Sequence, residues 1–209
     1  MRKNEIDAWL AELTRALGPA RPPVPKAEFL RLNAKKDLVG MFRLVRKHMR
    51  LGIRLRLLFR ERVRNDAAME VYVPRPMPLY GTAEYRHLCI VVAVSETYLR
   101  DAPAEMLVVG IAHELSHVLL AALGNPLWQV EPAVDLAAMV LGFRDFFLLH
   151  SECGVKRERI PPSLWDRVKR ILTGYEAVQE KVLTHRIGYL TAEELGYAHA
   201  CLQTGMIRR

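Results

Sequence analysis

Two histidines and a glutamate stand at spacings that suit a metal-dependent hydrolase. They belong to the pentapeptide His113-Glu114-Leu115-Ser116-His117, which has the pattern HExxH. Residues four apart lie on the same face of an α-helix, so His113 and His117 can bind one metal ion together. Glu114, the next residue round the helix, can take a proton from a metal-bound water. The pattern therefore indicates a zinc hydrolase with Glu114 as its general base.

The residues around this motif predict a helix from Pro103 to Leu123 that is apolar nearly all round and therefore buried. Burying two imidazoles and a carboxylate is costly unless a partner compensates them, and a divalent cation would do so. The competing interpretation is a core helix whose two histidines share a face and are satisfied by hydrogen bonds. The buried surroundings favour the metal site.

A catalytic zinc needs a third protein ligand and an open position for water. Gly124-Asn125-Pro126 ends the first helix, and the next helical pattern runs from Val130 to about Leu149. Glu131 and Asp135 lie four apart on one face of its first turn. We interpret Glu131 as the third ligand of one zinc ion per chain, and Asp135 as the hydrogen-bond partner of a ligand histidine. The alternative is a first turn that simply favours negative charge.

HExxH followed by ExxxD, the latter as Glu131-Pro132-Ala133-Val134-Asp135, resembles the gluzincin metallopeptidases, the group that includes thermolysin. Over residues 86–143, the order of a strand, an acidic link and these two helices is most similar to the CAAX-prenyl-protease and heat-shock membrane protease family. This chain lacks that family's membrane helices. The resemblance implies a zincin-like fold and a zinc metalloendopeptidase activity. It also implies an edge strand beside the site, which we place at Leu88–Val94 and expect to bind substrate by strand addition.

Other HExxH classes fit less well. A metzincin would place glycine and histidine at positions that Leu120 and Leu123 occupy. A SprT-type DNA–protein-crosslink protease would use a later histidine as its third ligand and often carries a cysteine-pair zinc ribbon. Here the next histidine is His150, and the sequence has no CxxC. Peptidases of the phage-repressor-cleaving type, with HExxH and a later ExEA pattern, stay open as relatives.

The rest of the chain must position this site, and its patterns predict an α+β fold. A small mixed sheet would pack on the HExxH helix, with flanking N- and C-terminal helices, in one domain over residues 1–209 (1–50 helical, 51–150 sheet and metal site, 151–209 helical). The expected elements are helices at Asn4–Leu17 and Lys26–Met49, strands at Leu51–Phe59, Glu70–Val73 and His87–Val94, a charged loop at Cys153–Pro162, and helices at Ser163–Leu183 and Thr191–Met206.

Composition indicates an ordinary globular protein, with 51% hydrophobic and 26% charged residues among 209. The three cysteines, Cys89, Cys153 and Cys201, are scattered and odd in number, which is typical of a reducing compartment. The N-terminus builds no apolar signal core, and no run of roughly eighteen uncharged apolar residues occurs. We therefore expect a cytoplasmic protein without a membrane span.

The net charge of +8 raises nucleic acid as a second class of partner beside a protein or peptide substrate. The alternative is an ordinary solvated basic surface, which the absence of interleaved aromatic residues favours. The basic residues concerned are Arg43, Arg46, Lys47, Arg50, Arg54, Arg56, Arg60, Arg62 and Arg64.

Two further function classes stay open beside the peptidase: a zinc-binding structural or sensor protein without turnover, and a DNA-associated protease. Glu114 favours an enzyme, because structural zinc sites usually close with four protein ligands. The group that stabilises the oxyanion of the reaction is not fixed by the sequence. The candidates are Tyr98, Arg144, His185, Tyr189 and His199.

Overall fold

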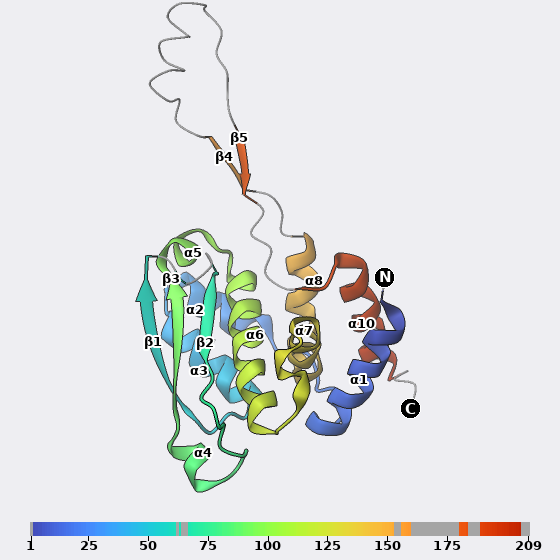
Figure 1. Ribbon diagram of the computed structural model, residues 1–209. Helices are drawn as coiled ribbons and strands as arrows, with labels where there is room; N and C mark the ends of the chain where they lie inside the picture. Colours follow the sequence, from blue (N-terminus) through green and yellow to red (C-terminus); the bar gives the residue numbers. More distant parts are fainter. Residues whose placement is uncertain are drawn as a thin grey trace, which may run out of the picture. The chain divides into compact units, whose positions relative to one another are not determined.

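The computed structural model confirms the α+β class, with a small mixed sheet beside a layer of helices (Figure 1). It describes residues 2–61, 63, 67–152, 156–159, 180–183 and 189–205. Residues 1–152 and 187–209 form one compact unit, and residues 153–186 form a second. The described part of the second unit is an antiparallel pair, β4 (Lys156–Arg159) and β5 (Glu180–Leu183). That residues 1–209 form a single domain stays a prediction.

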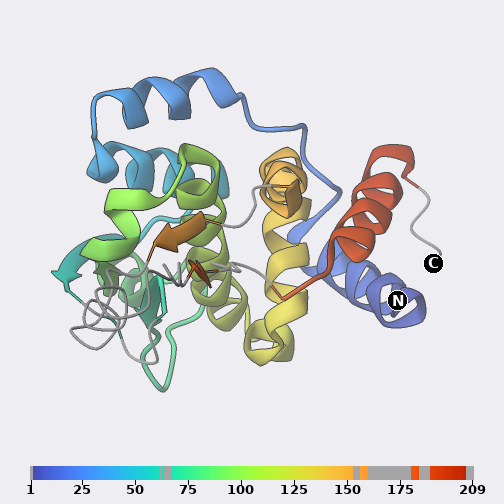
Figure 2. The same ribbon diagram turned by 90° about the horizontal axis from the view of Figure 1, so that it is seen from above.

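Helix α6 (Ala104–Ala122) is the centre of the larger unit and carries the HExxH motif. It contacts β2 and α3 on one side and α7 and α8 on the other, an arrangement visible in both views (Figures 1 and 2). Among the described residues, α6 alone has the length and hydropathy of a membrane span, and 78% of its apolar window is buried in the fold. The apolar residues all round the helix therefore find protein contacts on every side.

The sheet has the strand order β1-β3-β2, with β1 (Arg54–Arg60) parallel and β2 (Met69–Tyr72) antiparallel to β3 (Cys89–Ser95). The three strands were all predicted, but the prediction that Leu88–Val94 is an exposed edge is wrong. β3 is paired on both sides, and β2 is the edge strand beside α6. The continuous apolar run Ile90–Val94 fits this central place, because a strand buried on both faces needs no polar alternation.

The N-terminal helices differ from the prediction at one point. α1 (Lys3–Leu17) forms as expected, but the predicted helix Lys26–Met49 is divided into α2 (Lys26–Ala34) and α3 (Leu38–Met49). The Asp37 side chain accepts a hydrogen bond of 2.8 Å from the Gly40 backbone N–H and so begins a new helix. Hydrophobic periodicity alone does not reveal such an internal cap.

The predicted helix Val130–Leu149 is also interrupted. It consists of α7 (Glu131–Ala138), a π-helical turn η3 (Met139–Phe143) and α8 (Arg144–Glu152). Gly142 has a φ of 104°, and the connector between α1 and α2 runs alongside this turn. The backbone N–H groups of Arg21 and Val24 donate to the carbonyls of Val140 and Gly142, each at 2.9 Å. These bonds satisfy carbonyls that the broken helix leaves free.

Gly142→Ala should lower the free energy of unfolding by about 2–4 kcal/mol. A Cβ at this position would lie 2.6 Å from the Pro22 carbonyl oxygen, and the positive φ adds backbone strain. Gly196→Ala is the matched control, because Gly196 lies inside α10 with open space around it; there alanine should stabilise by about 0.5–1 kcal/mol. Urea unfolding of both variants measures the difference, and an unchanged midpoint for Gly142→Ala would contradict it.

The C-terminal segment gives mixed results. Helix α10 (Ala192–Thr204) forms with the predicted capping box between Thr191 and Glu194. The predicted loop Cys153–Pro162 contains β4, and the predicted helix Ser163–Leu183 ends in β5, with residues 163–179 outside the described part. Pairing between segments distant in sequence is not visible in local periodicity. Two short helices, α4 (Ala83–His87) and α5 (Glu96–Asp101), were missed although capping residues precede them.

Candidate metal centre

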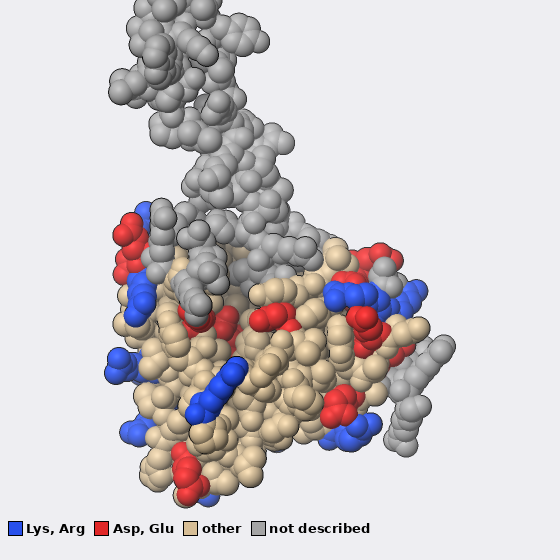
Figure 3. Space-filling model, in the orientation of Figure 1, with Lys and Arg blue, Asp and Glu red and all other residues tan. Residues whose placement is uncertain are grey.

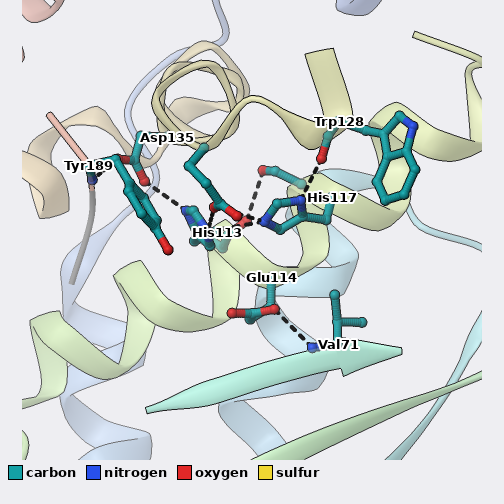
Figure 4. Close-up of polar contacts among 10 residues, drawn as sticks. Val71, His113, Glu114, His117, Trp128, Asp135 and Tyr189 are labelled. Atoms are coloured by element: carbon teal, nitrogen blue, oxygen red, sulfur yellow. Dashed lines mark hydrogen bonds and ion pairs between the residues drawn. The ribbon is translucent and has the colours of Figure 1, made fainter. Parts of the chain in front are cut away.

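Helix α6 places the two motif histidines one turn apart on a single face. Their ring centroids are 4.8 Å apart, and the two Nε2 atoms are separated by 3.1 Å. His113 is buried, and the His117 side chain is 13% exposed. Both rings therefore present the same nitrogen to one point beside the helix (Figure 4).

The turn after α6 brings a carboxylate to the same point. Leu123 and Gly124 end the helix, and the Asn125 side chain caps the short 3-10 helix η2 (Pro126–Gln129) through the Leu127 N–H at 2.9 Å. Glu131, the first residue of α7, then places its Oε2 atom 3.0 Å from His113 Nε2 and 3.3 Å from His117 Nε2. The structure thus brings His113, His117 and Glu131 together, as predicted from the sequence.

The remaining ring nitrogens are held from outside. His113 Nδ1 lies 2.8 Å from Asp135 Oδ1, and His117 Nδ1 lies 2.6 Å from the Trp128 carbonyl oxygen. Because a carboxylate and a carbonyl can only accept, both Nδ1 atoms carry the proton and donate it. When its ring is neutral, each histidine can then offer the lone pair of Nε2 to the centre. Asp135 is fully buried and contacts the outer nitrogen of His113, the position predicted for it from the sequence.

These donor atoms fit a zinc ion. Zn–N and Zn–O bonds of about 2.0–2.2 Å in tetrahedral geometry separate neighbouring ligand atoms by about 3.3 Å. The three separations here are 3.0, 3.1 and 3.3 Å. Three acceptors this close repel one another unless a cation or protons lie between them. The Glu131 side chain is 38% exposed, so the cluster opens to solvent on one side.

The pKa shifts of His113 and Glu131 indicate how protons would compensate the cluster without a cation. Burial would lower the pKa of His113, but hydrogen bonds to Asp135 and Glu131 outweigh it and raise the pKa to about 10. Burial would raise the pKa of Glu131, but hydrogen bonds to both histidines lower it to about 2. Both shifts favour a proton shared between His113 and Glu131 whenever no cation lies between them.

Glu114 lies beside the cluster and is not one of the three converging ligands (Figure 4). Its Oε2 atom accepts a hydrogen bond of 2.9 Å from the Val71 N–H on strand β2. Burial raises the pKa of Glu114, and the nearby His113 and His117 act in the opposite direction. The carboxylate is thus tied to the sheet edge and held next to the histidines.

Three contacts of this centre were not predicted. The Trp128 carbonyl and the Val71 N–H belong to the backbone, which gives no side-chain signal in a sequence. Tyr189 donates its backbone N–H to Asp135 Oδ2 at 2.6 Å, and its ring stacks on His113 with centroids 5.7 Å apart. The only clue in the sequence was a general rule: a metal-binding histidine usually donates its other ring N–H to a carboxylate or a backbone carbonyl.

Of the oxyanion candidates, Tyr189 contacts the centre through His113 and Asp135. Tyr98 is buried in the core near Gly110. Arg144 donates to the Arg21 carbonyl at 2.6 Å, and His199 lies 3.1 Å from Asp145. His185 lies outside the described residues. The oxyanion role of any of them stays a prediction.

Comparison with known proteins gave no match to a family model, to a curated protein or to a solved structure. The resemblance to gluzincins therefore stays a prediction from the sequence motifs.

Proposed function

We propose that this protein is a zinc-dependent metallopeptidase of the gluzincin type. The observation that supports it best is the convergence of His113 Nε2, His117 Nε2 and Glu131 Oε2 within 3.0–3.3 Å, with both outer nitrogens already bonded. A structural zinc site normally closes with a fourth protein ligand. Here a further carboxylate, Glu114, lies next to the cluster, as a general base requires.

The chain's residues have distinct roles in this proposal. His113, His117 and Glu131 would hold the zinc ion, which would activate a water and polarise the scissile carbonyl. Glu114 takes the proton of the attacking water and passes it to the leaving amine. Asp135 and the Trp128 carbonyl fix the orientation of the two imidazoles.

Strand β2, not β3, is the edge at which a substrate would bind. The Ala68 carbonyl accepts from Ser95 N–H on the β3 side at 3.0 Å, so the backbone groups of Met69 and Val71 face away from β3. Val71 N–H points to Glu114. An extended peptide paired with the other outward-facing backbone groups of this edge would bring its backbone past the general base.

The zinc-loaded protein should cleave a mixture of denatured proteins. Removing zinc with a chelator should abolish cleavage, and adding back one equivalent should restore it, because His113, His117 and Glu131 would bind a single ion. Gel electrophoresis and mass spectrometry of the fragments provide the measurement. Lack of cleavage by zinc-loaded protein would instead favour the structural or sensor class.

Zinc binding should tighten as the pH rises. In the metal-free site the pKa of His113 is raised to about 10, so a proton must leave before Nε2 can bind metal at neutral pH. Glu131, with its pKa lowered to about 2, is already ionised and releases no proton. The apparent affinity should therefore increase about tenfold per unit between about pH 6 and pH 8. Competition with a coloured chelator measures it, and a flat profile would contradict the proton exchange.

The nucleic-acid alternative gains no specific support. Arg46 donates to the Ile53 carbonyl and Arg54 to the His87 carbonyl, both at 2.9 Å, so part of the basic cluster is engaged with the backbone. Arg62 and Arg64 lie outside the described residues. Figure 3 shows two small acidic patches near the middle of this face with one basic side chain below them, and both acidic and basic side chains along its margins, so no continuous basic surface lies on this side.

A further inference from the structure

Arg75 lies on Trp128 at one end of the candidate centre. Its guanidinium carbon is 5.2 Å from the centroid of the indole ring, a cation–π contact. Arg75 is exposed, and across the described part of the chain no carboxylate lies within ion-pair distance of it. Among the described residues, its charge is therefore positioned by the indole and is not paired with a carboxylate.

Both partners of this contact are connected to the proposed catalytic groups. The Trp128 carbonyl accepts from His117 Nδ1, so the residue that supports Arg75 also orients a ligand. Arg75 follows β2, four residues beyond Val71, whose N–H donates to Glu114. Figure 4 shows β2 passing beneath Glu114 toward the side on which Trp128 lies. A peptide paired with the β2 edge would therefore extend toward Arg75.

The surrounding charges set the chemistry of this position. The centre itself is acidic, with Glu114, Glu131 and Asp135 close together. A cation–π contact uses none of the guanidinium N–H groups as hydrogen-bond donors to the indole, so these groups can bind a carboxylate in a two-bond geometry. The contact also restricts the Arg75 side chain before a ligand arrives, which lowers the entropy cost of binding.

We propose that Arg75, supported by Trp128, binds a carboxylate of the substrate. The group would be an Asp or Glu side chain, or the C-terminal carboxylate, about three or four residues from the scissile bond, since four strand residues span roughly 13 Å. This inference rests on the proposed function, because it names which peptides the same centre takes.

The test uses binding to zinc-loaded Glu114→Gln protein, which should hold peptides without cleaving them. The probes are ten-residue peptides of Ala and Leu with one Glu, Gln or Lys at each position in turn, each made with a free and an amidated C-terminus. Calorimetry should show that a Glu three or four residues from the centre binds about tenfold more tightly than Gln. If the amidated peptides keep this preference, the side chain is the source; if amidation abolishes binding, it is the C-terminus.

Variants of Arg75 make the test specific. Adding Arg75→Gln to the same protein should remove the preference for Glu, and adding Arg75→Glu should reverse it in favour of Lys. Arg43→Gln is the matched control, because it removes an exposed cation from α3, outside the centre, and should leave the preference intact. Equal binding of the Glu and Gln peptides, or binding of none, would overturn the inference.

The same peptides separate this inference from the proposed function. Wild-type protein that cleaves them without regard to charge, with Arg75→Glu unchanged, would overturn the Arg75 site and leave the peptidase. Arg75-dependent binding of the Glu peptides without any cleavage by the wild type would support the site and overturn the peptidase.

Discussion

Glu114→Gln is expected to bind zinc as the wild type does and to hydrolyse peptides about 10²- to 10⁴-fold more slowly. Glutamine cannot take the proton of the attacking water, because its amide is not a base at neutral pH. Its carbonyl oxygen can still accept the Val71 N–H hydrogen bond that Glu114 makes at 2.9 Å, so the fold and the sheet edge should be preserved. Initial rates with one fluorogenic peptide provide the measurement.

Glu70→Gln is the control for this change. Glu70 is on β2, one residue before Val71, and its carboxylate is 3.4 Å from the Tyr72 hydroxyl rather than at the cluster of His113, His117 and Glu131. Glu70→Gln removes the same charge from the same region. It should change kcat less than about threefold, because charges on the protein surface interact only weakly with the site. If Glu114→Gln keeps half of the wild-type kcat, Glu114 is not the general base.

Glu131→Ala should release zinc, whereas Asp135→Ala should keep it with about 10- to 100-fold lower affinity. The sequence spacing allowed either acid to be the ligand, but the structure separates their positions. Glu131 Oε2 lies with the two Nε2 atoms, while Asp135 Oδ1 contacts Nδ1 on the far side of His113. Glu131→Ala removes one of the three converging donor atoms. Asp135→Ala keeps all three donor atoms but frees the His113 imidazole to rotate.

Metal titration of the two variants under one set of conditions measures the difference. Asp135→Asn is a useful companion, because it keeps the size of a side chain whose oxygens contact His113 and the Tyr189 N–H. Unfolding curves must accompany the titration, since Asp135 is fully buried and its loss leaves donors without partners, at about 1–3 kcal/mol each. Zinc retained by Glu131→Ala and lost by Asp135→Ala would reverse the two roles.

The centre could be predicted largely because its parts are local in sequence. His113 and His117 share a helix, and Glu131 and Asp135 share the next one, so helical spacing alone places each pair on one face. The turn between the helices is short and marked by Gly124 and Pro126. One face of each helix carries the candidate ligands, and the short turn limits how the two helices can pack. Few arrangements of the two helices therefore bring these side chains together.

What could not be predicted depends on contacts between distant segments. The strand order β1-β3-β2 follows from how three segments pair, and periodicity describes each strand by itself. The helix break at Gly142 is stabilised by backbone hydrogen bonds from Arg21 and Val24, which lie more than a hundred residues away in the sequence. Local periodicity does not predict such a contact. The Trp128 carbonyl and the Tyr189 N–H are backbone groups, and every residue except proline has both.

Zinc content per chain tests the central claim most directly. Wild-type protein, exchanged into metal-free buffer after incubation with excess zinc, should retain about one ion per chain, since His113, His117 and Glu131 form a single three-donor centre. His117→Ala, treated identically and shown by circular dichroism to be folded, should retain almost none. Elemental analysis against protein concentration gives the ratio. Equal zinc in the two proteins, or none in the wild type, would contradict the metal centre.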